Sequence, residues 1–84
     1  MSKTEKLLAA CRNNPNGVGF TDLVRLLTAV GFVHDRTTGS HMIFVHERAT
    51  VPLMNLQRTK DGMAKPYQVR QVLAVIDSYG LEVK

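Results

Sequence analysis

One short stretch of this 84-residue chain combines a residue suited to catalysis with an apolar run. There Gly39, Ser40 and His41 are followed directly by Met42–Val45. A histidine ring titrates near neutral pH and is suited to proton transfer. The apolar run after it predicts a strand. The pattern alone leaves two interpretations of His41 open. One is a general acid or base at the start of a strand, and the other, more common for a histidine on a half-buried strand, is a structural histidine packed against the sheet.

The turn before His41 must be built from threonines and a glycine. A two-residue type I′ turn on Thr38 and Gly39 would push a β-branched residue to positive φ, which is costly. In a three-residue loop, Thr37 and Thr38 form a type I turn, and Gly39 takes the left-handed position beside a bulge. The sequence therefore predicts the three-residue loop.

This loop fixes which side chains face one another across the hairpin. Arg36 would lie opposite Ser40, and Asp35 opposite His41, where its carboxylate would hold the ring as in a hydrolase triad. The expected core face consists of Phe32, His34, Arg36, Ser40, Met42, Phe44 and His46. The expected open face consists of Val33, Asp35, His41, Ile43 and Val45.

The segment before these strands predicts two helices. The first spans about residues 3–12, with apolar positions three and four apart, and the polar residues 13–17 end it. The second begins near Thr21, a good capping residue, and ends at Gly31. Its expected core face consists of Leu23, Leu26, Leu27 and Val30.

A third strand over about residues 49–56 contains Pro52, which predicts an edge position because proline cannot donate to the ladder. An irregular segment, 57–65, leads to a last helix that begins with Pro66 and ends at Gly80. Its buried stripe should be Val69, Val72, Leu73 and Ile76. The order α-α-β-β-β-α predicts a single α+β domain over residues 1–84, with helices packed on one face of a three-stranded antiparallel sheet.

Composition narrows the class of protein. The chain is 44% hydrophobic and 21% charged, as in ordinary globular proteins. Its apolar runs fall far short of the roughly 20 residues that a membrane-spanning helix needs. The lone Cys11 cannot form an internal disulfide, which suits a reducing cytoplasm, and we expect it to be buried. His34 and His46 should lie on the other face from His41, so we expect no metal site.

Basic residues indicate an anionic partner. The net charge is +4, and Arg58, Lys60 and Lys65 fall in one segment, which suggests RNA, although a solvated surface explains the excess as well. Beside Lys65, the backbone N–H groups of Tyr67 and Gln68 begin a helix and can hold a phosphate. The alternative there is an ordinary helix start with a solvated lysine.

Several segments carry a resemblance to a known family: GF before Arg36, then GSHMIFVH, VPLMNLQ and DGMAKPYQVRQVL. In order and wording they resemble the HicA toxins of bacterial toxin–antitoxin pairs, over nearly the whole chain. The resemblance implies a fold like the double-stranded RNA-binding domain and the activity of an mRNA interferase. It also implies that the histidine of the GSH motif, His41, is catalytic, with Gly39 and Ser40 beside it. Asn55 stands where many members carry a second histidine.

We therefore expect a cytoplasmic, metal-independent endoribonuclease that cleaves mRNA and inhibits translation and growth. The resemblance implies a HicB-like antitoxin that covers the catalytic face, in a simple or a higher-order complex, and no membrane. Val33, Ile43 and Val45 would give that antitoxin an apolar contact. One alternative is a non-catalytic RNA-binding module of the same fold, with His41 merely packed. Another is a small scaffold protein with an incidental excess of positive charge.

Overall fold

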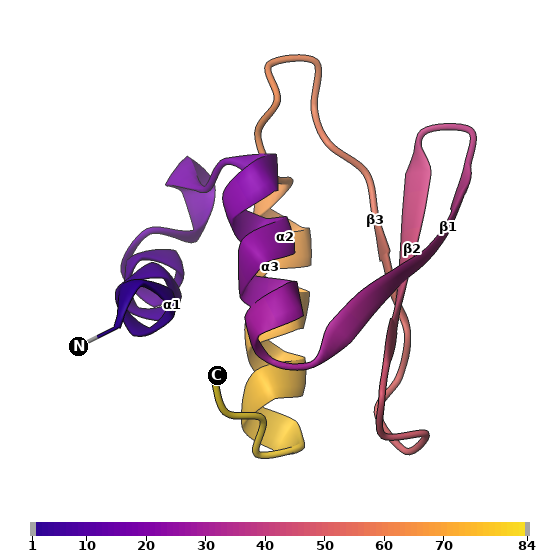
Figure 1. Cartoon of the computed structure of the whole chain (residues 1–84). Helices are drawn as coiled ribbons and strands as arrows, with labels where there is room; N and C mark the ends of the chain where they lie inside the picture. The colour runs from indigo at the N-terminus through magenta and orange to yellow at the C-terminus, as the bar shows by residue number, and fades with distance from the viewer. Residues whose placement is uncertain (1, 84) are drawn as a thin grey trace.

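A three-stranded sheet packs on helices α2 and α3, and α1 lies on the other side of α2 from the sheet (Figure 1). The computed structural model describes residues 2–83. The elements in chain order are α1 (Lys3–Asn13), a short 3₁₀ helix η1 (Pro15–Gly17), α2 (Phe20–Ala29), β1 (Phe32–Thr38), β2 (His41–His46), β3 (Met54–Leu56) and α3 (Pro66–Ser78). None of the helices in this part of the chain is long and apolar enough to span a membrane.

The strands are antiparallel in the order β1-β2-β3, so β2 is central and β3 is an edge strand. The predicted α+β class and element order are confirmed. They are also consistent with the RNA-binding-domain-like architecture that the resemblance implies.

Local signals explain where the helices begin and end. Ser2 and Glu5 form a reciprocal capping box at the start of α1, which satisfies two N–H groups that have no helical partner. Pro66 is the first residue of α3, as predicted, and Gly80 has a φ of 60° after its end. The predicted start of α2 was wrong by one residue, and Thr21 is not its cap. Gly19 precedes the helix without a side-chain hydrogen bond.

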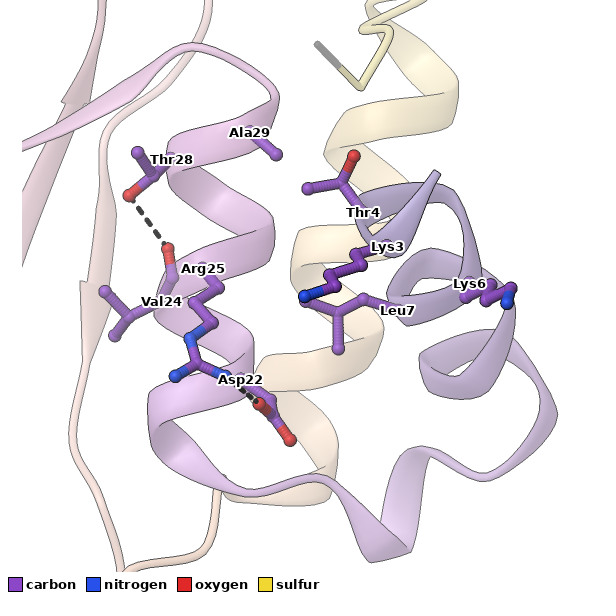
Figure 2. A pocket seen from close by; sticks show the side chains of 9 residues that line it. All are labelled: Lys3, Thr4, Lys6, Leu7, Asp22, Val24, Arg25, Thr28 and Ala29. Carbon is purple, nitrogen blue, oxygen red and sulfur yellow. Dashed lines mark hydrogen bonds and ion pairs between the residues drawn. The ribbon is translucent and has the colours of Figure 1, made fainter. Parts of the chain in front are cut away.

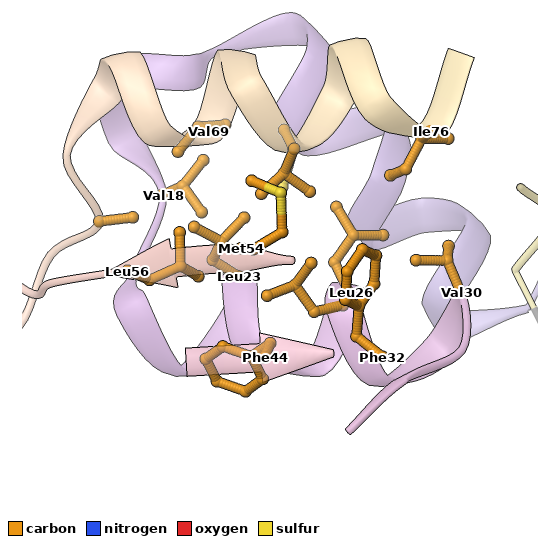
Figure 3. Close-up of a cluster of buried hydrophobic side chains, with 14 of the residues drawn as sticks. Val18, Leu23, Leu26, Val30, Phe32, Phe44, Met54, Leu56, Val69 and Ile76 are labelled. Atoms are coloured by element: carbon orange, nitrogen blue, oxygen red, sulfur yellow. The ribbon is translucent and has the colours of Figure 1, made fainter. Parts of the chain in front are cut away.

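The core lies between the sheet and the α2–α3 layer (Figure 3). The rings of Phe32 and Phe44 come from the inner face of the sheet and are almost fully buried, as are Leu23 and Leu26 of α2. The predicted core face of α2 is confirmed in full. In α3 the predicted stripe is buried except for Leu73, which is partly exposed.

The β1–β2 hairpin differs from the prediction. Only two residues, Gly39 and Ser40, join the strands, and Thr38 pairs with His41. Gly39 has a φ of 60°, and no other residue of the described chain except three further glycines has a positive φ. Glycine at the first central position is the signature of a type II′ turn. The three-residue loop was therefore wrong, because the glycine alone supplies the positive φ and Thr38 stays in the strand.

A bulge further along β1 changes which residues face outward. His34 pairs with Phe44, but Arg36 pairs with Ile43, so that Asp35 is the extra residue. A bulge adds one residue and reverses the alternation beyond it. Arg36 was predicted on the core face, but it lies on the open face with His41. The predicted pairing of Asp35 with His41 is wrong because the two-residue turn pairs Thr38 with His41 instead.

The third strand is shorter than predicted and covers three residues, Met54–Leu56. The chain before it turns instead, with the Val51 N–H donating to the Arg48 carbonyl at 3.1 Å. Pro52 then separates this turn from the strand. The predicted edge position of the strand is confirmed.

The N-terminal helix is held to α3 by a two-pronged ion pair. The Arg12 guanidinium donates to both carboxylate oxygens of Asp77, at 3.0 and 2.6 Å. This hydrogen bonding holds the pKa of the Asp77 carboxyl below its ordinary value. Cys11, one residue earlier, is buried as predicted, and burial raises the pKa of its thiol, which makes it a poor nucleophile.

Gln68 is a buried polar residue of α3 that holds the edge strand. Its Oε1 accepts from the Gln57 N–H at 3.1 Å, and its Nε2 donates to the Asn55 carbonyl at 3.3 Å. Buried polar groups are costly unless they are paired. These two hydrogen bonds therefore fix the end of β3 against α3 on both sides of Leu56.

Truncation of Leu23 tests the core. Because Leu23 is fully buried and Leu53 is 54% exposed, Leu23→Ala should lower the free energy of unfolding by about 2–5 kcal/mol, whereas Leu53→Ala should change it by less than about 0.5 kcal/mol. Urea unfolding followed by circular dichroism measures both. Equal losses in the two variants would contradict the core described above.

Replacement of Gln68 tests the link between α3 and the edge strand. Gln68→Leu leaves the Gln57 N–H and the Asn55 carbonyl without their partner, at a cost of about 1–3 kcal/mol in the free energy of unfolding. The matched control is Gln71→Leu, because Gln71 is an exposed glutamine of the same helix. If both variants unfold at the same urea concentration as the wild type, Gln68 does not stabilise the edge strand.

Candidate active site

His41 lies in a shallow hollow on the open face of the sheet. The hollow has a volume of about 290 Å³ and takes residues from all three strands, namely Arg36, Thr38, His41, Ile43 and Asn55. His41 is exposed, and Ile43 forms the buried floor at 7% exposure. The site is therefore open to a large ligand, in contrast to the enclosed cavities that bind small molecules.

The His41 ring is held by Asn55 and not by Asp35. Its Nδ1 lies 3.1 Å from the Asn55 Oδ1. Asn55 pairs with Ile43 across the β2–β3 ladder, and both side chains point away from the core because Met54 and Leu56 point into it. Sequence reasoning missed Asn55 as a site residue. The available signal was its position, where the family resemblance implies a second histidine in many members.

The predicted supporting residue Asp35 has a different partner. Its carboxylate forms an ion pair with the neighbouring Arg36 guanidinium, and both side chains remain largely exposed. The pair places one cation at the wall of the hollow beside His41. Asp35 therefore contacts Arg36, and only Arg36 lines the hollow.

A second cation, Lys65, connects to the loop before His41. Its Nζ donates to the Gln57 Oε1 at 2.9 Å, and the Gln57 Nε2 donates to the Ser40 Oγ at 2.8 Å. Ser40 is the residue directly before His41. The chain of contacts thus links the start of α3 to the hairpin turn, and Lys65 is partly buried within it.

The other predicted anion-binding residues lie along one loop and helix start. Arg58 and Lys60 are exposed, and a bridge between Arg58 and Ala64 closes the loop that carries them. Tyr67 is 54% exposed. The prediction of a free Gln68 N–H was wrong, because this group donates to the Lys65 carbonyl at 2.9 Å.

The two remaining histidines have structural contacts. His46 donates from Nε2 to the Val30 carbonyl at 2.7 Å, and its Nδ1 accepts from the Arg48 N–H at 2.9 Å. The His34 Nε2 lies 2.9 Å from the Thr37 Oγ1, and the His34 ring packs against Phe44. Residues 2–83 bring no three histidine, cysteine or carboxylate groups together as a metal site.

A larger hollow of about 790 Å³ lies between α1 and α2 (Figure 2). Leu7 and Lys3 point from α1 toward α2, where Arg25 and Asp22 form an ion pair of 3.3 Å. No histidine lines this hollow, and α1 and α2 form it on the side away from the sheet. It is therefore separate from the hollow around His41.

A family model described as the HicA toxin of bacterial toxin–antitoxin systems matches residues 20–77. The match runs from the first residue of α2 almost to the end of α3 and includes the whole sheet. No curated protein and no solved structure matches the chain. Since the matched range covers more than half of the 84 residues, the chain belongs to the HicA family of bacterial toxins.

Proposed function

We propose that this toxin is an endoribonuclease, an mRNA interferase that stops translation and growth by cleaving RNA with His41 as its general acid–base group. One observation carries the proposal. His41 is exposed in an open hollow, Asn55 holds its Nδ1, and its Nε2 has no hydrogen-bond partner among residues 2–83. A ring that is fixed at one nitrogen and free at the other is positioned to exchange a proton with a bound molecule.

The reaction that fits is attack by a ribose 2′-hydroxyl on the adjacent phosphorus. The neutral imidazole takes the proton of the hydroxyl while the O2′–P bond forms and the P–O5′ bond breaks. The products are a 2′,3′-cyclic phosphate and a 5′-hydroxyl end, whose oxygen takes a proton from water. The protonated imidazole then gives its proton to the hydroxide left in the solvent, which regenerates the neutral ring. Such proton transfer contributes about 10² to 10⁴-fold to the rate.

Cations near the hollow would provide the electrostatic stabilisation of the transition state. Negative charge develops on the phosphate oxygens during the attack, and fixed donors aimed at it stabilise the transition state. Arg36 lines the hollow, and Lys65 is connected to the Ser40 turn through Gln57. Arg58 and Lys60 extend the positive charge along the loop, where they contact the RNA backbone with little dependence on sequence.

The open face also suits a protein inhibitor. Val33 is 62% exposed and pairs with the partly exposed Val45, and Leu53 is 54% exposed. Ile43 was expected to join this apolar contact, but it is 7% exposed and offers little surface. We propose that a HicB-like antitoxin binds these residues and covers His41, which keeps the toxin inactive in the cytoplasm until its release.

Removal of the imidazole tests the activity. His41→Ala should lower the cleavage rate by at least about 10²-fold and abolish growth arrest, while folding and RNA binding are retained. Purified protein and a labelled RNA give the rate, and RNA integrity after induction gives the effect in cells. The matched control is His34→Ala, since His34 is an exposed histidine of the neighbouring strand that does not line the hollow.

Two results would reject the nuclease. If soluble, folded wild-type protein leaves RNA intact, the chain does not cleave RNA. If His41→Ala retains full growth arrest, a non-catalytic RNA-binding module is the better explanation.

Neutralisation of Lys65 tests the substrate contact. In the His41→Ala background, Lys65→Met should weaken RNA binding and lower the slope of log affinity against log salt by about 0.7, as for the loss of one phosphate contact on a single strand. Fluorescence anisotropy at several salt concentrations measures the slope. Lys3→Met on α1 is the control, and an equal change in both variants would show that Lys65 contributes only to the overall charge.

A further inference from the structure

The hydrogen bond between His41 and Asn55 determines which ring nitrogen carries the proton. The Asn55 Oδ1, 3.1 Å from the His41 Nδ1, is a carbonyl oxygen and can only accept. The His41 Nδ1 must therefore be the donor. In the neutral ring, the lone pair is then on Nε2, the nitrogen without a partner in residues 2–83.

His46, on the same strand, has the opposite arrangement. Its Nε2 donates to the Val30 carbonyl, and its Nδ1 accepts from the Arg48 N–H. Both of its nitrogens are used, and its ring packs edge-on against Phe32 at 4.9 Å between centroids. The neighbours of each ring thus set two different tautomers on one strand.

We propose that Asn55 is a positioning residue that holds His41 in the Nδ1–H tautomer and so makes Nε2 the atom that accepts the substrate proton. The inference rests on the proposed function of His41. It adds the residue that selects the reactive nitrogen, a role that the sequence had suggested for Asp35. Asn55 itself acts through His41 and needs no contact with the RNA.

The surroundings of Asn55 suit this role because they restrain it from two sides. Asn55 pairs with Ile43 in the β2–β3 ladder, and its backbone carbonyl accepts a hydrogen bond from the buried Gln68 side chain at 3.3 Å. His41 is restrained through Ser40, whose hydroxyl accepts from Gln57 at 2.8 Å. A hydrogen bond between two restrained partners orients the ring with little loss of freedom on substrate binding.

An amide at position 55 also differs from a carboxylate in its effect on charge. A carboxylate would hold the same tautomer but would stabilise the protonated ring. The amide orients the ring without adding a negative charge beside the bound phosphate. Asn55→Asp and Asn55→Ala therefore separate orientation from charge.

The first test reads the tautomer directly and needs no activity. In protein labelled with ¹⁵N-histidine, two-bond ¹H–¹⁵N spectra at about pH 8.5, where imidazoles are neutral, should show His41 as Nδ1–H and His46 as Nε2–H. Asn55→Ala should remove the preference at His41 and leave His46 unchanged, which makes His46 an internal control. A wild-type His41 ring in the Nε2–H form, or an Nδ1–H form that Asn55→Ala does not alter, would overturn the proposal.

The second test links the tautomer to cleavage. Asn55→Ala should lower kcat by about 10- to 100-fold with an unchanged KM for RNA. Asn55→Asp should restore the Nδ1–H ring and much of kcat, and should move the acid limb of the pH–rate profile to higher pH. A wild-type kcat in Asn55→Ala would overturn the proposal. An inactive wild-type protein with an Nδ1–H ring at His41 would instead refute the proposed nuclease.

Discussion

The pairing of β3 with β2 connects the hydrophobic core to the candidate active site. Successive side chains of a strand point to opposite faces, so the burial of Met54 and Leu56 forces Asn55 outward. On β2 the burial of Phe44 sets the outward direction of His41 in the same way. The hydrogen bond between His41 and Asn55 is thus a by-product of core packing on the reverse face, and a shift of one residue in this register would separate the two side chains.

The sequence predicted the helices better than the hairpin, for a physical reason. The apolar stripe of α2 repeats over three turns, so an error at one residue, such as the start at Thr21, changes little. The turn depended on a single choice between two and three residues, and that choice set the partner of His41. The bulge at Asp35 was not predicted from the sequence. The prediction of His41 as an open-face residue nevertheless held, because Phe32 and Phe44 mark the core face and His41 lies on the opposite face from Phe44.

Sequence reasoning overlooked the side-chain amides at the site, and it singled out Gln68 only for its backbone N–H. The predicted hairpin register placed Asp35 opposite His41, and its carboxylate was therefore expected to hold the ring. In the structure, Asn55, Gln57 and Gln68 make the contacts that join the hairpin, the edge strand and α3. An amide both donates and accepts, so one side chain can connect two elements and leave no charge to be compensated in a partly buried place. Lys65, the cation in this network, donates to the Gln57 side-chain oxygen and is thereby held next to the hairpin turn.

The exposure of the site is consistent with a mechanism in which one imidazole transfers a single proton and solvent supplies the other. In an in-line displacement at phosphorus, the attacking and leaving oxygens lie on opposite sides, and a ring with one free nitrogen reaches only one of them. In the proposed reaction, the His41 Nε2 serves the 2′ oxygen, and the 5′ oxygen must obtain its proton elsewhere. Water can supply this proton because the hollow is exposed. Asn55, which stands where the family resemblance implies a second histidine, cannot supply it because its amide is not a useful acid. In the proposed mechanism, the same exposure leaves His41 open to RNA whenever this face is uncovered, which is why we propose that the antitoxin covers it.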